Sequence, residues 1–276
     1  MSILFTKLIL GGGGIQGILH IGALEELEKT QPLYFPEGVY GSSIGAIIGT
    51  YIAFGLPINK LLSFIEKYLT FDRVVPTPVM SYFAKAFSTK GFFPMDMFET
   101  TVVELFSEAG LDIKDKTVGD ASMPLYILAS NISKACPTLF SKNVPLLSAL
   151  KCSCCIPGLF KPQELYGQLY IDGDIFSPAI WAVVPNNETT LVFSLFKGSF
   201  TKITPENVDS ISPFSYVRDI YMMMRYQFVS KTMQSNILVL QYPELKSTSD
   251  LSKFDINAIL ESSRNQLRTF LAKCAN

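Results

Sequence analysis

The feature that most constrains this chain is a glycine–serine elbow at residues 41–45, which reads Gly-Ser-Ser-Ile-Gly. It matches the pattern G-x-S-x-G and lies between a strand-like apolar segment at 39–41 and an apolar segment able to form a helix. A serine in such a strand-to-helix turn takes a strained backbone conformation and points its hydroxyl out of the sheet. Side chains at Gly41 or Gly45 would crowd the turn. Ser43 is therefore a candidate nucleophile, the alternative being a small residue that fills a tight turn.

A nucleophilic serine needs donors for an oxyanion, and a glycine-rich loop at 11–17 offers them. The loop follows a predicted strand at 5–10 and opens a predicted helix at 15–29. Glycines let successive backbone N–H groups turn outward, and the helix N-terminus adds its positive dipole end. The sequence therefore allows an oxyanion hole at this loop.

The same loop permits two other interpretations. Gly12-x-Gly14-x-x-Gly17 fits the dinucleotide fingerprint G-x-G-x-x-G, which expects an acidic residue at the end of the second strand. Glu37 is near the expected distance but precedes that strand. A glycine-rich turn without a ligand is the third possibility. The loop alone leaves all three open.

The base has to be found outside the usual histidine position. The single histidine, His20, precedes Ser43, so the order serine, aspartate, histidine cannot be built. We predict that His20 is a packed structural residue of its helix. Asp172 follows an apolar strand at 169–171, a placement that aims its side chain at the same rim of a parallel sheet. An Asp-Gly turn is the alternative for Asp172, and Asp174 is a competing carboxylate.

Apolar periodicity predicts alternating strands and helices. We therefore expect an α/β fold, a three-layer sandwich with a mostly parallel central sheet and helices on both faces. Beyond the segments already named, strands are predicted at 124–131, 190–195 and 237–241, and helices at 44–54, 58–69, 95–109, 144–155 and 256–272.

No composition break marks a linker, so one domain over 1–276 is predicted, with the motifs in a core at about 5–195 and the elements of 196–276 packed on it. Residues 70–94 are apolar but broken by proline and glycine, which indicates a lid over an apolar cleft. The Met- and aromatic-rich run at 216–229 is interpreted as the lining of an acyl cleft, a membrane contact or ordinary core.

Composition narrows the function classes. The net charge is −1 with no basic stripe, which excludes nucleic acid as an expected partner. No signal peptide or transmembrane helix is expected, because the N-terminus lacks a basic region and no apolar run approaches about eighteen residues. The five cysteines, three of them crowded into 152–155, favour reduced thiols in an intracellular, cytoplasmic protein. They lack metal-ligand spacing, so neither metal nor cofactor is expected. No feature indicates an oligomeric state.

Three motifs together resemble the patatin-like phospholipase family, whose pattern is D-G-G-G-x-R-G, then G-x-S-x-G, then D-G-G or D-G-A. Here they stand, in the same order, as the glycine loop at 11–17, the elbow at 41–45 and Asp172-Gly173-Asp174. The segment 153–162 is similar to the family's A-S-x-A-x-P-x-x-F-x-P stretch before the aspartate. The resemblance covers about residues 5–180.

This resemblance implies a patatin-like fold and a lipid acyl hydrolase of the phospholipase A or lysophospholipase type. Ser43 would be the nucleophile and Asp172 the base of a Ser–Asp dyad, with Gly12, Gly13 and Gly14 as oxyanion donors. An acyl-enzyme would form without a metal. The substrate would be a phospholipid or another fatty-acyl ester, met at a membrane interface.

Three residues depart from the family pattern. Gly11 stands where the family has aspartate, Gln16 replaces arginine or lysine, and Asp174 replaces a small residue. Because neighbouring carboxylates raise each other's pKa, we expect Asp174 to alter the activity rather than abolish it. A lipid-binding protein of the same fold with impaired catalysis is one alternative, and a dinucleotide-binding oxidoreductase is the other.

Overall fold

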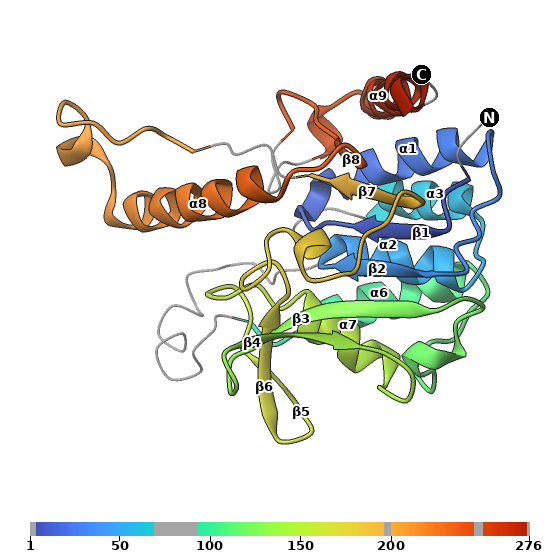
Figure 1. The fold of residues 1–276 in the computed structure, drawn as a ribbon. Helices are drawn as coiled ribbons and strands as arrows, with labels where there is room; N and C mark the ends of the chain where they lie inside the picture. Colours follow the sequence, from blue (N-terminus) through green and yellow to red (C-terminus); the bar gives the residue numbers. More distant parts are fainter. Residues whose placement is uncertain (1–3, 69–92, 196–199, 246–250, 275–276) are drawn as a thin grey trace.

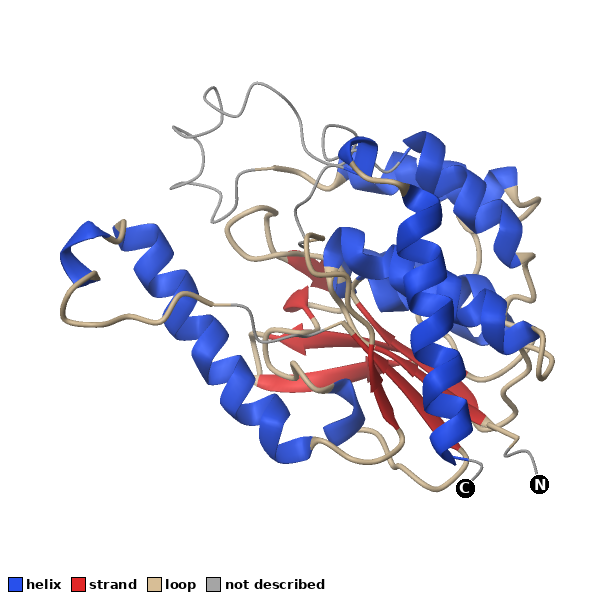
Figure 2. Ribbon diagram, turned by 90° about the horizontal axis from the view of Figure 1, so that it is seen from above, coloured by secondary structure: helices blue, strands red, loops and turns tan. Residues whose placement is uncertain are grey.

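The computed structural model describes residues 4–68, 93–195, 200–245 and 251–274. A central sheet is covered on one face by most of the helices, and on the other by a short 3₁₀ helix and the end of one long helix (Figures 1 and 2). The predicted three-layer α/β sandwich is therefore confirmed, with layers of unequal thickness. The lid predicted at 70–94 lies, except for residues 93–94, outside the described residues.

The described strands form one sheet in the order β5–β6–β3–β2–β1–β7–β8, with β4 also paired to β3. The strands of the β3–β2–β1–β7–β8 part run parallel. The pairings of β4 and β6 with β3, and of β5 with β6, are antiparallel, and the sequence did not indicate β4 or β5. The strand bounds are β1 Lys7–Leu10, β2 Gly38–Ser42, β3 Leu125–Asn131, β4 Cys136–Phe140, β5 Gln163–Leu165, β6 Gln168–Asp172, β7 Thr190–Ser194 and β8 Ile237–Val239.

The helices lie close to their predicted positions, although the glycine loop opens with a 3₁₀ turn rather than directly with an α-helix. The α-helices are α1 Ile18–Glu28, α2 Ile44–Ala53, α3 Ile58–Tyr68, α6 Asp96–Glu108, α7 Leu146–Ser153, α8 Pro213–Thr232 and α9 Ile256–Cys274. The 3₁₀ helices are η1 Gly14–Gly17, η3 Val118–Asp120, η4 Ile180–Ala182, η5 Val208–Ser210 and η6 Leu251–Lys253. The long helix α8 projects past the sheet (Figure 1).

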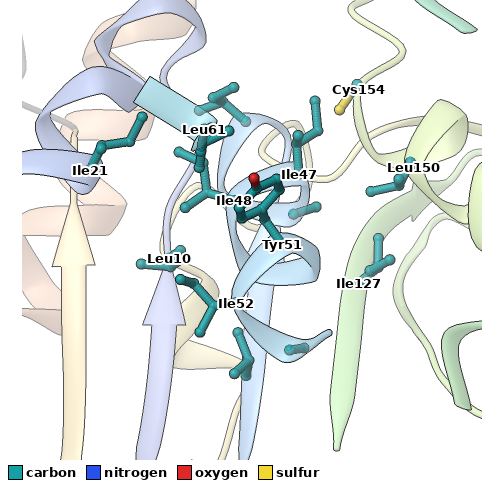
Figure 3. Packing of buried hydrophobic residues seen from close by; sticks show 14 of the residues in the cluster. Leu10, Ile21, Ile47, Ile48, Tyr51, Ile52, Leu61, Ile127, Leu150 and Cys154 are labelled. Atoms are coloured by element: carbon teal, nitrogen blue, oxygen red, sulfur yellow. The ribbon is translucent and has the colours of Figure 1, made fainter. Parts of the chain in front are cut away.

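Helix α2 is buried along its whole length, which fixes the elbow that precedes it. Figure 3 shows Ile47, Ile48 and Tyr51 packed among side chains from β1, β3, α1 and α7. Burying one such side chain contributes about 1.5–3 kcal/mol, so the helix is strongly held. On the opposite face of the sheet, Trp181 of η4 and Val229 of α8 cover a smaller apolar cluster.

Helix α9 packs along α1, the helix that follows the glycine loop. Gly22 allows the close approach, because a Cβ there would lie 2.8 Å from the carbonyl oxygen of Leu260. Arg268 donates two hydrogen bonds of 2.8 and 2.9 Å to the Glu26 carboxylate, and this contact lowers the pKa of Glu26 to about 2. Helix α1 is consequently buried on more sides than its amphipathic pattern indicated.

Candidate active site

The elbow holds Ser43 in a strained conformation, with φ 53° and ψ −127°. A residue other than glycine keeps such angles only when its surroundings impose them. Here the Ser43 N–H donates a 3.0 Å hydrogen bond to Oγ of Ser153 on α7, whose hydroxyl donates to the Leu128 carbonyl at 2.6 Å. Close packing also requires glycine at position 41, where a Cβ would lie 2.5 Å from Cα of Ala46. The support from Ser153 could not be predicted from the sequence.

The structure brings Ser43 and Asp172 together. The Ser43 hydroxyl lies close enough to the Asp172 carboxylate to lower the pKa of that group, and the two residues are only 8% and 4% exposed. The predicted nucleophile and the predicted base are thus neighbours in a site largely shielded from water.

Asp172 reaches this position by a different route from the one predicted. We expected a parallel strand that ends at the common rim, but β6 runs antiparallel to β3. Asp172 pairs with Ala129 of β3, and Leu128, the preceding residue of β3, pairs with Ser42 at the end of β2. An antiparallel strand therefore delivers its last residue to the elbow because both pair with β3.

The pKa of Asp172 is raised to about 7, chiefly by burial and secondly by the charge of Asp174. The N–H of Asp174, which donates to Asp172 Oδ1 at 2.9 Å, the Ser43 hydroxyl and the positive charge of Arg225 act in the opposite direction. A carboxylic acid with a pKa near neutrality is a far better proton acceptor than an ordinary surface aspartate.

The competing carboxylate, Asp174, is occupied by other partners. Its Oδ1 accepts a 2.6 Å hydrogen bond from the Ser42 hydroxyl, and its Oδ2 accepts one of 3.3 Å from Arg225 of α8. The Ser43 hydroxyl acts instead on the neighbouring Asp172, whose pKa it lowers. Sequence reasoning missed both Ser42 and Arg225. The second acidic residue in Asp-Gly-Asp was the available signal, since a buried carboxylate requires partners.

The glycine loop lies directly against the nucleophile. A Cβ added to Gly12 would be 2.8 Å from Cβ of Ser43 and would overlap the Asp174 carboxylate. At Gly13 it would be 2.8 Å from the side chain of Leu195, and Gly14 has a φ of 58°, which favours glycine. The three predicted donor glycines therefore occupy a turn next to Ser43 that excludes side chains.

His20 supports this loop from within the core. The ring is fully buried, donates from Nε2 to the Gly11 carbonyl at 2.9 Å and stacks on Phe193 with ring centroids 6.0 Å apart. Burial lowers the pKa of His20 to about 4, so the ring is neutral at physiological pH. This is the packed, structural histidine that the order of residues indicated.

Glu37 cannot serve the dinucleotide interpretation. Its carboxylate binds Thr6 and Asn187 beside the beginning of β1 and β2, whereas the glycine loop follows the end of β1. An acid that binds a ribose must lie at the same end of the strands as the phosphate loop. The fingerprint match therefore lacks its acidic partner, and we do not propose it further.

The crowded cysteines Cys152, Cys154 and Cys155 are free and buried, and burial raises the pKa of each thiol. Within the described ranges, no group of three or more His, Cys, Asp and Glu is placed to hold a metal ion. Likewise, none of the helices in the described part of the chain is long and apolar enough to cross a membrane.

Comparison with known proteins places these motifs in a family. The profile of the patatin-like phospholipases matches residues 8–183, which include the glycine loop, the elbow and Asp172. The chain belongs to the patatin-like phospholipase family. VipD from Legionella pneumophila has a similar fold, with a TM-score of 0.59 and 15% sequence identity over 98% of this chain and 67% of its own.

Curated relatives agree with this patatin-like assignment. The chain is 27% identical over 194 residues to an uncharacterized NTE family protein of Mycobacterium tuberculosis, covering 69% of this chain and 49% of the relative. It is 25% identical over 216 residues to lysophospholipase nte1 of Aspergillus fumigatus, covering 75% of this chain and 13% of that enzyme. The chain thus spans about half the length of the mycobacterial relative and a small part of the fungal one.

Proposed function

We propose that this protein is a lipid acyl hydrolase of the phospholipase A or lysophospholipase type that works through a Ser43–Asp172 dyad. The observation that carries the proposal is the proximity of these two buried side chains, one on a strained elbow and the other with a pKa of about 7. Membership of the patatin-like phospholipases supports fatty-acyl esters as the substrate class.

In the proposed mechanism, Asp172 takes the proton from Ser43 as Oγ bonds to the ester carbonyl carbon. Backbone N–H groups of Gly12, Gly13 and Gly14 receive the oxyanion, a type of contact worth about 3–4 kcal/mol per donor. The tetrahedral intermediate collapses, and the departing alcohol takes the proton from Asp172. Water then attacks the acyl-enzyme with Asp172 again as base, releasing a fatty acid and restoring Ser43. The scheme uses no metal or cofactor.

Helix α8 supports a contact with a membrane surface. Val217, Ile220, Met224 and Phe228 recur at spacings of three and four residues, so they share one face of the helix. All four are exposed, Val217 and Met224 by 66% each. An exposed apolar stripe on a projecting helix suits an interface where lipid esters lie (Figures 1 and 2). We propose that this face meets the lipid surface.

A fluorophosphonate probe and a lipid panel test the proposal together. Wild type, Ser43→Ala, Asp172→Asn and a control, Ser230→Ala on the exposed side of α8, are compared. We expect labelling and fatty-acid release in wild type and in the control, and neither in Ser43→Ala. Labelling without release from any phospholipid, lysophospholipid or neutral lipid would favour the catalytically impaired lipid-binding protein. Undiminished hydrolysis by Ser43→Ala would refute the dyad.

A further inference from the structure

The carboxylate of Asp174 lies where a negative charge opposes the proposed reaction. Its Oδ2 packs against Gly12 of the glycine loop, and its backbone N–H is bonded to Asp172 Oδ1 at 2.9 Å. A charge in this position repels both an oxyanion held by the loop and the ionised form of Asp172. Because the site is buried, such repulsion is screened far less than at the surface.

Arg225 of helix α8 forms an ion pair with the Asp174 carboxylate. Its guanidinium is 3.3 Å from Asp174 Oδ2, and the two side chains are only 16% and 11% exposed. Tyr221, one turn earlier on α8, has its ring 5.7 Å from the guanidinium carbon and its hydroxyl 3.5 Å from the Asp174 carbonyl oxygen. A planar guanidinium stacked on an aromatic ring is held in a defined place. The ion pair thus ties α8 to the turn that follows Asp172, the last residue of β6.

We propose that Arg225 is a positioning residue of the active site, whose guanidinium neutralises Asp174 and thereby keeps Asp172 able to accept the Ser43 proton. This inference rests on the proposed function. It gives α8 a second role beyond its exposed apolar face, because displacement of the helix would remove the compensating charge from the site.

The groups around Asp172 determine in which direction its pKa changes when Arg225 is replaced. Asp174 raises the pKa of Asp172 and Arg225 lowers it, so their effects oppose one another. The other titratable neighbours are Tyr221, Cys154 and Cys155, whose pKa values burial raises. These three stay neutral around pH 7, so the balance of charge at Asp172 depends on Asp174 and Arg225.

The test is the pH dependence of fluorophosphonate labelling and of lipid hydrolysis. We expect Arg225→Gln to raise the pKa of Asp172 by about one unit. This moves the acid limb of the pH–rate profile upward and lowers both rates about fivefold at pH 7. The loss should fall on kcat rather than KM. Arg225→Lys should keep most of the activity, and Asp174→Asn alone should move the limb downward. Adding Asp174→Asn to Arg225→Gln should restore the limb to near its wild-type position.

Lys231→Gln is the matched control, since it removes an exposed charge from the same helix. An unchanged limb in folded Arg225→Gln, or a double variant as impaired as the single one, would overturn the inference. If Arg225→Gln does not fold, Arg225→Lys and Asp174→Asn test the inference in its place. An acid limb that does not move in Asp174→Asn would then contradict the inference. Failure of wild type to label at Ser43 removes the proposed function and this inference with it, whereas labelling with an insensitive limb removes the inference alone.

Discussion

Two buried titratable side chains near the glycine loop, His20 and Asp172, show how one physical cause produces different roles. Burial favours the neutral form of each, so it lowers the pKa of His20 to about 4 and raises that of Asp172 to about 7. His20 is thereby taken away from neutral pH and becomes a fixed hydrogen-bond donor to Gly11. The pKa of Asp172 is instead brought to about 7, which suits the base that we propose it to be. The comparison predicts that substitution of Asp172 mainly affects turnover, whereas substitution of His20 mainly affects stability.

The largest expected effect is at Asp172. Asp172→Asn cannot accept the Ser43 proton, so we expect turnover to fall roughly 10²–10⁴-fold. Because the folded-state pKa lies above the ordinary value of 3.8, the group's favourable contribution is fully present below pH 3.8 and is lost as pH rises through about 7. The variant should therefore melt at a higher temperature than wild type at pH 8. Kinetic measurements test the loss of turnover, and thermal melts at pH 5 and pH 8 test the gain in stability. A variant that stays fully active, or that is less stable than wild type at pH 8, would contradict these predictions.

Gly12→Ala should reduce turnover on the order of 10²-fold, comparable to the loss of one oxyanion donor. Its new methyl would lie 2.8 Å from Cβ of Ser43 and overlap Asp174, so the loop must shift. Gly11→Ala is the matched control, because a Cβ there would meet its nearest neighbour, the Phe193 carbonyl, at 3.4 Å. Fatty-acid release by the two variants measures the difference, and equal rates would argue against a donor role for Gly12.

A third prediction concerns the acid limb of the wild-type rate. Hydrolysis should fall about tenfold for each pH unit below about 7, since only the ionised form of Asp172 accepts the proton. A plot of kcat/KM against pH between 5 and 9 locates the limb. An acid limb near pH 4, the ordinary pKa of an aspartate, would show that burial does not raise the pKa of the catalytic base.

The smallest effect on activity is expected at His20. His20→Ala removes a buried ring and one hydrogen bond, which should cost about 2–4 kcal/mol of stability while turnover changes less than about threefold. Since the pKa of His20 is lowered in the fold, its contribution is present above pH 6.5 and is lost as pH falls towards about 4. Denaturant melts should therefore show the variant to be less acid-sensitive than wild type. A folded variant without activity would mean that the ring takes part in catalysis.

The local parts of the site could be predicted from sequence because their signals are local. Gly41 and Ser43 lie within five residues, and the turn that they require is dictated by backbone sterics. The run of glycines at 11–14 likewise indicated a loop whose backbone conformation needs residues without a side chain. Both elements lie close to the predicted bounds.

Contacts between distant segments could not be predicted in the same way. Nothing in the periodicity of 163–172 distinguishes an antiparallel hairpin from a single parallel strand, so the approach of Asp172 was misjudged. Arg225 lies 51 residues after Asp174 within a run of methionine and tyrosine, and its pairing depends on where α8 crosses the site. Neither choice is fixed by neighbouring residues.

The packing of α9 along α1 has a consequence for how the protein matures. The glycine loop is synthesised well before α9, yet α1 behind it is held by Arg264 and Arg268 of α9, which bind Glu25 and Glu26. A nascent chain that already contains the elbow and Asp172 still lacks α9, the helix that packs against α1. We therefore expect the glycine loop to take its final conformation only after α9 has been synthesised and has packed against α1.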